Sequence, residues 1–139
     1  MFETLEHKGE VGVKGTAYSQ EKAFGETAKA MFGVMADISK IRPEQEFEVK
    51  ASAENAEELL VEWLNELLYV SSVNNALFCE FTVEIEQRNG EFFLSGKALG
   101  EKIDFERHSL YIEVKAASYS GLKVEETDGK VSAQCLLDI

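Results

Sequence analysis

The sequence predicts an α+β fold, with two helices packed on one face of a mixed, largely antiparallel sheet of about six or seven strands in a two-layer arrangement. Two stretches place apolar residues at helical spacing, and several short stretches alternate apolar and polar residues as half-buried strands do. Asn89-Gly90 and Asp128-Gly129 each separate two alternating stretches by two residues. Such pairs are typical of tight hairpin turns because Asn, Asp and Gly tolerate a positive φ.

The first half of the chain contains both predicted helices. Residues 2–6 are expected to form an edge strand, and residues 11–18 alternate as a half-buried strand. Ser19 is a suitable N-cap for a helix that ends near Met35, with an apolar stripe formed by Phe24, Ala28, Met31 and Met35. Residues 46–51 then form a strand, and Asn55 with Glu58 predicts a capped second helix whose apolar face includes Trp63.

The second half of the chain is expected to be almost entirely strands. Residues 81–86 and 92–99 form the arms of the first hairpin, and residues 100–108 form a loop. Residues 112–116 are expected to form a strand, as are residues 122–125 and the closing stretch from Val131 to Leu137. No repeat or linker interrupts the chain, so 139 residues are expected to form a single domain spanning 1–139.

The chain is strongly acidic, with 26 acidic and 14 basic residues and a net charge of −12. This balance argues against direct binding of nucleic acid, which requires a basic surface, and favours a basic protein partner or a bound cation. Residues 51–90 contain eight acids and one base. This stretch is interpreted either as a solvated face or as a docking surface for a basic partner. No signal-peptide pattern or long apolar run is present, so we expect no membrane association and a cytoplasmic location.

The sequence contains none of the common catalytic motifs. There is no phosphate-binding loop, nucleophile elbow, HExxH or CxxC pattern. Cys79 and Cys135 lie in apolar stretches and are interpreted as small core residues. His7 and His108 could each serve as a metal ligand or as an ordinary structural or surface histidine.

The strongest candidate for chemistry is the end of the sequence, Cys135-Leu136-Leu137-Asp138-Ile139. Asp138 and the α-carboxylate of Ile139 place two groups of hard oxygen ligands at a strand end, although this is also what a freely solvated terminus would look like. Glu10 lies at the start of another strand. If the two strands are neighbours, three carboxylates converge, and Ca²⁺, Mg²⁺ or Mn²⁺ would relieve their repulsion.

Several segments together resemble the archease family. They include Ala30-Met31-Phe32, the second helix from Leu59 to Tyr69, Arg107-His108, Glu113-Val114-Lys115-Ala116, Val124-Glu125-Glu126-Thr127-Asp128-Gly129 and Leu137-Asp138-Ile139. Archeases are small non-enzymatic activators of the GTP-dependent 3′-phosphate RNA ligase of tRNA splicing. The resemblance therefore implies a protein cofactor that promotes guanylylation and multiple turnover of a partner ligase.

The resemblance also implies a divalent-metal site, most consistent with Ca²⁺, formed by Glu10, Asp138 and Ile139. The family's His-Thr-Ala-Asp element corresponds here to His7-Lys8-Gly9-Glu10, so the acid is longer by one methylene. His7 and Lys115 are expected to contact the partner or assist activation, while Lys115 could instead form a surface ion pair. Two alternatives remain, a general chaperone or adaptor for nucleic-acid enzymes and a metal-dependent hydrolase.

Overall fold

Two hairpins from opposite ends of the sequence form one antiparallel sheet. The computed structural model describes residues 1–7 and 9–139, with side chains described for all of these except residues 5–7. The first hairpin pairs β1 (Phe2–His7) with β2 (Glu10–Ala17), and the last pairs β6 (Ala116–Thr127) with β7 (Lys130–Asp138). The strand order is β1-β2-β7-β6, so β2 and β7 are neighbours at the centre of the sheet.

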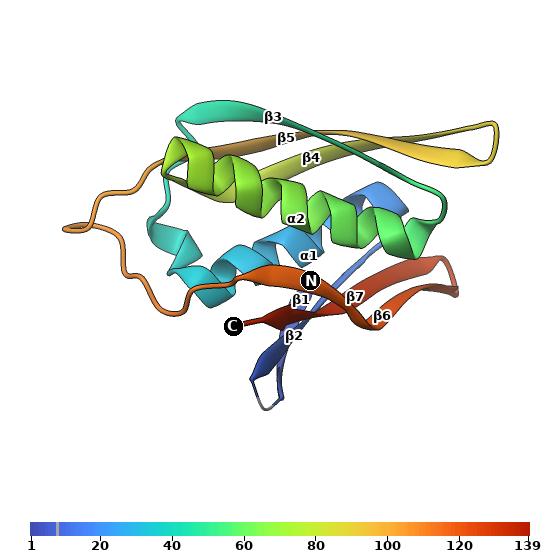
Figure 1. The fold of residues 1–139 in the computed structure, drawn as a ribbon, viewed down its shortest axis with the longest axis horizontal. Helices are drawn as coiled ribbons and strands as arrows, with labels where there is room; N and C mark the ends of the chain where they lie inside the picture. The colour runs from blue at the N-terminus through green and yellow to red at the C-terminus, as the bar shows by residue number, and fades with distance from the viewer. Residues whose placement is uncertain (8) are drawn as a thin grey trace.

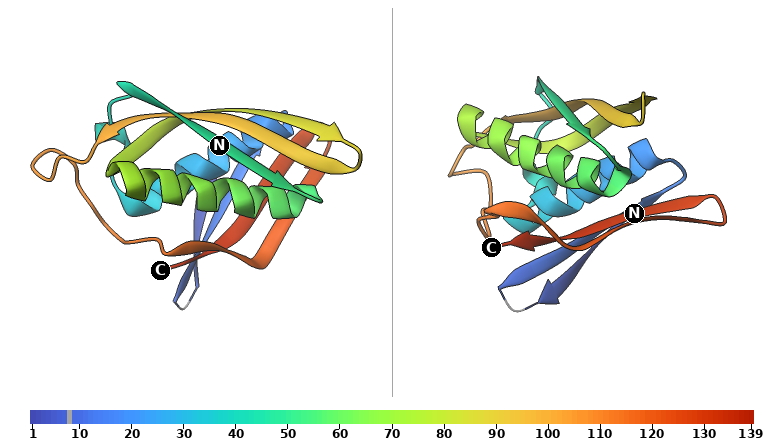
Figure 2. Two further views of the ribbon diagram at one scale, coloured as in Figure 1. Left: turned by 45° about the horizontal axis from the view of Figure 1, so that its top comes forward. Right: turned by 45° about the vertical axis from the view of Figure 1, so that its right-hand side comes forward.

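The middle of the chain forms a second antiparallel sheet of order β3-β5-β4. Its strands are β3 (Gln45–Ala53), β4 (Ala76–Arg88) and β5 (Glu91–Lys102). The helices α1 (Gln20–Met35) and α2 (Ala56–Asn74) lie between the two sheets (Figures 1 and 2). A short 3₁₀ turn, η1 (Ile38–Lys40), follows α1.

The α+β class and the two helices are confirmed, and the described chain has seven strands, within the expected six or seven. The single sheet with both helices on one face is wrong, because the strands form two sheets. The reason is the burial of α1, which contacts β2 of one sheet and β4 of the other. Nine of its residues are buried, including Ala30 and Phe32 outside the predicted stripe. A helix that is apolar on most sides needs apolar neighbours on both sides, which one sheet does not supply.

Close packing fixes α1 against the first sheet. Ser19 caps the helix by accepting a hydrogen bond from the Lys22 N–H at 3.1 Å. A Cβ at Gly15 of β2 would collide with α1 backbone at Thr27, so glycine allows the helix to approach directly. The Thr27 hydroxyl lies 3.0 Å from the carbonyl oxygen of Ala133 in β7 and joins the helix to the next strand.

The second helix is fixed by its cap and by its tryptophan. The Asn55 side chain accepts from the Glu58 N–H at 2.8 Å, as the capping pattern predicts. Trp63 is fully buried, and its indole N–H donates to the Phe24 carbonyl of α1 at 3.1 Å. This bond satisfies the polar atom of a large apolar side chain and couples the two helices.

Both predicted tight turns are confirmed, with positive φ at Asn89 and Gly90 and at Asp128 and Gly129. The predicted strand 112–116 is wrong, because β6 begins at Ala116. Its partner β7 ends at Asp138, which pairs with Ala116, so preceding residues have no strand beside them. The predicted strand 122–125 is part of the same β6, interrupted by an irregularity between Ser118 and Lys123.

Candidate functional site

The register between β2 and β7 places Glu10 directly opposite Asp138. Opposed residues of an antiparallel pair project from the same face with their Cβ atoms about 4.5–5.5 Å apart. Their neighbours Val11 and Leu137 face the core, so the two carboxylates project from the outer face of the sheet. The strand neighbours on which the predicted carboxylate cluster depends are therefore present.

One oxygen of Glu10 is in an unusual position. Oε2 of Glu10 is buried and has no hydrogen-bond partner within the part of the chain that the structure describes. An unpartnered buried carboxylate oxygen is unfavourable, because it loses hydration without compensation. A cation held between Glu10 and Asp138 would supply the missing interaction.

Asp138 is held by its backbone and leaves its side chain exposed. It pairs with Glu10 on one side and with Ala116 on the other, and its carbonyl oxygen accepts a hydrogen bond from the Lys115 N–H at 2.8 Å. This bond places the backbone of Lys115 next to that of Asp138, while the Lys115 side chain lines a hollow beside α2. The Lys115 side chain is exposed and forms no ion pair with the residues whose side chains are described.

Other predicted ligands are placed differently. Ile139 follows Asp138 directly and is half-buried. The His7 backbone pairs with Glu10 across the first hairpin, but its side chain lies outside the described residues, as does Lys8 altogether. Among the described side chains, no group of three His, Cys, Asp or Glu residues has the geometry of a metal site. Glu10 and Asp138 thus meet without a third acidic, imidazole or thiol side chain from the described part of the chain.

His108 is buried and both of its ring nitrogens form hydrogen bonds within the protein. The Asp104 N–H donates to Nδ1 at 2.8 Å, so Nε2 carries the proton, and it lies 2.9 Å from Oε2 of Glu101. Both ring nitrogens are engaged, which leaves no lone pair for a metal ion. Sequence reasoning gave no role to Glu101, whose burial only the fold reveals.

Glu101 is the centre of a buried polar cluster. It accepts hydrogen bonds from the Arg107 guanidinium and from the Arg42 N–H, the latter at 2.7 Å, in addition to its contact with His108. The Arg107 bond is the main cause that lowers the pKa of the Glu101 carboxyl to about 2. The cluster attaches the segment between β5 and β6 to the chain near η1, since Arg107 also donates to the Lys40 carbonyl at 2.9 Å.

Two further contacts fix the start of β6 against α2. The Asn65 side chain accepts from the Ala117 N–H at 2.8 Å and donates to the Ala117 carbonyl at 3.3 Å. The Tyr119 hydroxyl donates to Glu62 at 3.1 Å, which raises the pKa of the phenol. Asparagine in the middle of a helix was the available signal for the first contact, because it is unfavourable there without such a partner.

The cysteines match their interpretation as core residues. Both thiols are free; Cys135 is buried and Cys79 is half-buried. Burial raises the pKa of Cys79 to about 11 and that of Cys135 to about 12, so both remain protonated at neutral pH.

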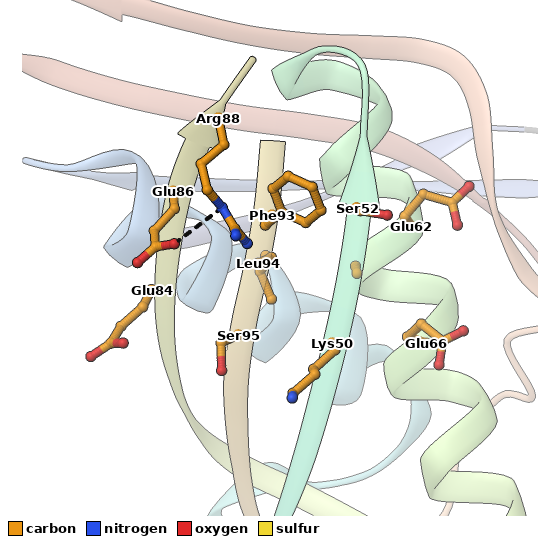
Figure 3. Close-up of a pocket in the computed structure, with 11 residues that line it drawn as sticks. Lys50, Ser52, Glu62, Glu66, Glu84, Glu86, Arg88, Phe93, Leu94 and Ser95 are labelled. Carbon is orange, nitrogen blue, oxygen red and sulfur yellow. Dashed lines mark ion pairs between the residues drawn. The ribbon is translucent and has the colours of Figure 1, made fainter. Parts of the chain in front are cut away.

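The acidic stretch 51–90 folds around a hollow of about 510 Å³ next to β3 (Figure 3). Glu62 and Glu66 of α2 line one side, and Glu84 and Glu86 of β4 line the other. Basic residues are interleaved with these acids: Lys50 lies between them, and Arg88 lies 3.6 Å from Glu86 and over the Phe93 ring. The hollow is therefore a mixed-charge surface. Within the described chain, no helix is long and apolar enough to cross a membrane.

The fold and this geometry define a class, a small acidic α+β protein whose first and last hairpins meet at a pair of carboxylates. The sequence profile of the Archease protein family matches residues 2–139. Protein archease of Pyrococcus furiosus is 39% identical over 99% of this chain and 98% of its own length. Protein archease of Methanosarcina mazei is 38% identical over 99% of this chain and 95% of its own length. The chain belongs to the Archease family.

Solved structures agree with this assignment. The solution structure of Methanobacterium thermoautotrophicum protein 1598 has a TM-score of 0.88 and 33% identity, covering 99% of this chain and 98% of that one. The crystal structure of a Thermotoga maritima protein, described as an archease and possible chaperone, has a TM-score of 0.59 over 97% of this chain and 94% of that one. At 18% identity, the second comparison supports the fold alone.

Proposed function

We propose that this chain is a non-enzymatic protein cofactor of a GTP-dependent 3′-phosphate RNA ligase of tRNA splicing. In this role it promotes guanylylation of the ligase and its multiple turnover in the cytoplasm. It contacts the ligase as a protein partner, without direct binding of nucleic acid or membrane, in keeping with the net charge of −12.

The observation that supports the proposal best is the pairing of Glu10 with Asp138, with one Glu10 oxygen buried and unpartnered. Such an arrangement is costly for folding alone, because two like charges and an unsatisfied oxygen share one place. It becomes favourable when the two acids bind a cation. The acids therefore fit a divalent ion, with Ca²⁺ preferred and Mg²⁺ or Mn²⁺ as alternatives.

In the proposed site Glu10, Asp138 and the α-carboxylate of Ile139 hold the ion. The ion, when bound, supplies positive charge that can attract anionic groups of the partner's nucleotide site. Lys115 lies on the adjoining segment with an exposed side chain and is suited to meet a phosphate or an acidic residue of the ligase. We assign His7 a partner-contact role at the same hairpin.

A purified-component assay tests the function. The chain is added in increasing amounts to the RNA ligase encoded in the same genome, and both ligase guanylylation and ligated product per ligase are measured. We expect more than one product per ligase only when the chain is present. Lys115→Ala and Asp138→Asn should lower the maximal stimulation, while the exposed Glu106→Gln should not. Unchanged ligase turnover with the wild-type chain would refute the proposal.

The ion site is tested separately by calorimetric titration of the chain with Ca²⁺, Mg²⁺ and Mn²⁺. We expect binding by the wild type, and at least tenfold weaker binding for Glu10→Gln and for a variant with added residues after Ile139. The added residues remove the α-carboxylate but leave both side chains in place. Equal binding by the extended variant would exclude Ile139 as a ligand.

A chaperone role is the second candidate, because the Thermotoga maritima protein is described as a possible chaperone. A chaperone would suppress aggregation of several unrelated nucleic-acid enzymes without altering guanylylation. Light scattering of heated client proteins, measured beside the ligase assay, separates the two functions.

A further inference from the structure

The end of β7 lies beside a short, separate part of β6. Strand β6 pairs with β7 in two parts, residues 116–118 and residues 123–127, with an irregularity between them. Asp138 is the last residue of β7, and it pairs with the first residue of each neighbouring strand, Glu10 of β2 and Ala116 of β6. Chain termini fray unless they are tied down. The position of Asp138 therefore depends on how firmly residues 116–118 are held.

Strand β6 is at the edge of its sheet, so one of its sides has no neighbouring strand in the described part of the chain. On that side, the side chain of Asn65 from α2 bonds to the backbone of Ala117. The Asn65 Oδ1 accepts from the Ala117 N–H at 2.8 Å, and Nδ2 donates to the Ala117 carbonyl at 3.3 Å. An antiparallel neighbour forms the same pair of bonds with one residue. Asn65 therefore takes the place of a neighbouring strand at Ala117.

The stability of α2 itself does not explain an asparagine at this position. Asn65 lies in the middle of the helix Ala56–Asn74, where asparagine is less favourable than alanine because its side chain competes for backbone groups. Asn74, near the end of the same helix, forms a local bond and donates to the Val70 carbonyl at 2.9 Å. Both bonds of Asn65 instead reach a strand 52 residues further along the chain. Asn65 therefore serves the contact with β6 at a cost to the helix.

The backbone around Ala117 connects Asn65 to the carboxylate pair. Ala116 pairs with Asp138, and the Lys115 N–H donates to the Asp138 carbonyl at 2.8 Å. Figure 1 shows the start of β6 between α2 and the end of β7. Holding Ala117 from its open side thus fixes the two residues that contact the Asp138 backbone from β6. The direction in which a strand side chain projects follows from its backbone, so the same contacts direct the Asp138 carboxylate.

We propose that Asn65 is a positioning residue for the carboxylate pair. By completing the open side of β6 at Ala117, it keeps Asp138 in register with Glu10 and so pre-organises the two acids for a divalent ion. Asn65 acts through the β6 backbone and is not itself a ligand. A group that is already in place loses less conformational freedom when it binds, so affinity for the ion rises. This inference rests on the proposed function, because it concerns the ion site proposed there.

Hydrogen exchange of the metal-free chain tests the positioning directly. In Asn65→Ala the Lys115 N–H, which bonds to the Asp138 carbonyl, should exchange at least tenfold faster, while amides of β5, in the other sheet, keep their wild-type rates. Asn74→Ala is the matched control on α2 and should leave the Lys115 rate unchanged. An unchanged Lys115 rate in Asn65→Ala, or equal acceleration in both sheets, would overturn the proposal, because the second result indicates only a general loss of stability.

A milder variant covers the case in which Asn65→Ala does not fold, which circular dichroism reveals. Asn65→Asp keeps the acceptor for the Ala117 N–H and loses the donor to the Ala117 carbonyl. Its Lys115 N–H should exchange faster than in the wild type and more slowly than in Asn65→Ala. An unchanged Lys115 rate in Asn65→Asp would also contradict a positioning role.

Calorimetric titration with Ca²⁺ then separates this inference from the proposed ion site. We expect Asn65→Ala to bind Ca²⁺ at least tenfold more weakly than the wild type, and Asn74→Ala to bind it equally well. If the wild type and Asn65→Ala bind Ca²⁺ with the same affinity, the ion site stands and only the role of Asn65 is wrong. If the wild type takes up no Ca²⁺, the proposed ion site fails, and this inference fails with it.

Discussion

Glu10 and Glu101 both lie near strand ends, but their carboxylates have opposite surroundings. Glu101 is 7% exposed and accepts hydrogen bonds from Arg107 and the Arg42 amide, and it contacts His108. Glu10 faces another acid, Asp138, and keeps one buried oxygen without a partner in the described chain. The first carboxylate is fully compensated, and the second is not.

The difference separates a structural group from a candidate binding group. A compensated buried charge holds elements together, and breaking it is costly because the remaining partners stay buried. A buried charge without partners contributes little to folding, and its presence is explained best by a ligand that the protein binds. Burial alone does not distinguish a structural carboxylate from a ligand-binding one. The number of hydrogen-bond and ionic partners of the carboxylate does, and four measurements test this distinction.

The largest effect is expected from removing the compensated carboxylate. Glu101→Ala removes the carboxylate that accepts from Arg107 and contacts the buried His108, so the free energy of unfolding should fall by about 3 kcal/mol. Urea denaturation measures this, with Glu106→Ala in the same segment as a control that should change stability by less than about 0.5 kcal/mol. A loss below about 1 kcal/mol would mean that the Glu101 cluster does not secure the segment 103–115.

The next effect is stabilisation by the cation that Glu10 and Asp138 are proposed to bind. At a Ca²⁺ concentration of about 100 times Kd, the wild type should gain about 2.7 kcal/mol, because the ion binds the folded state. Thermal unfolding with and without Ca²⁺ measures the gain. Glu10→Gln should lose it and Glu101→Gln should keep it, since only the first alters the carboxylate pair. An equal gain in both variants would place the ion elsewhere.

A pH dependence follows from the pKa of Glu101, lowered to about 2 from an ordinary value near 4.5. The folded state holds this carboxyl ionised, so its stabilisation is complete above about pH 4.5 and is lost as the pH falls towards 2. We expect the stability difference between wild type and Glu101→Gln to shrink by on the order of 2 kcal/mol across that range. Denaturation at pH 7, 4.5 and 2.5 measures it. A constant difference would show that the Arg107 contact does not hold the charge.

The smallest effect is expected at Glu10 in the absence of metal. Glu10→Gln removes one of two facing negative charges, so the free energy of unfolding should stay within about 0.5 kcal/mol of wild type or rise slightly. Denaturation in the presence of a chelator measures this. A loss as large as that of Glu101→Ala would show that Glu10 has a structural partner and would remove the contrast between the two acids.

The local elements of this protein follow from short stretches of its sequence. Ser19 and Asn55 cap the two helices, and Asn89-Gly90 and Asp128-Gly129 form the tight turns, because side-chain capping and positive φ depend only on neighbouring residues. The pairing of Glu10 with Asp138 was predicted only as a condition, that their strands be neighbours. Their proposed metal-binding role, with Ile139, stays a prediction.

How these elements combine depends on contacts between distant parts of the chain. Alternating patterns show that a strand has one wet face, but they carry no information on whether seven strands form one sheet or two. The burial of α1 on both sides produces the two sheets. Residues 112–115 have a strand-like sequence but no neighbouring strand, because β7 ends at Asp138. Glu101 likewise has partners from separate parts of the chain, which its local sequence does not reveal. Pairing and compensation of charge depend on residues distant in sequence, so they become visible only in the folded chain.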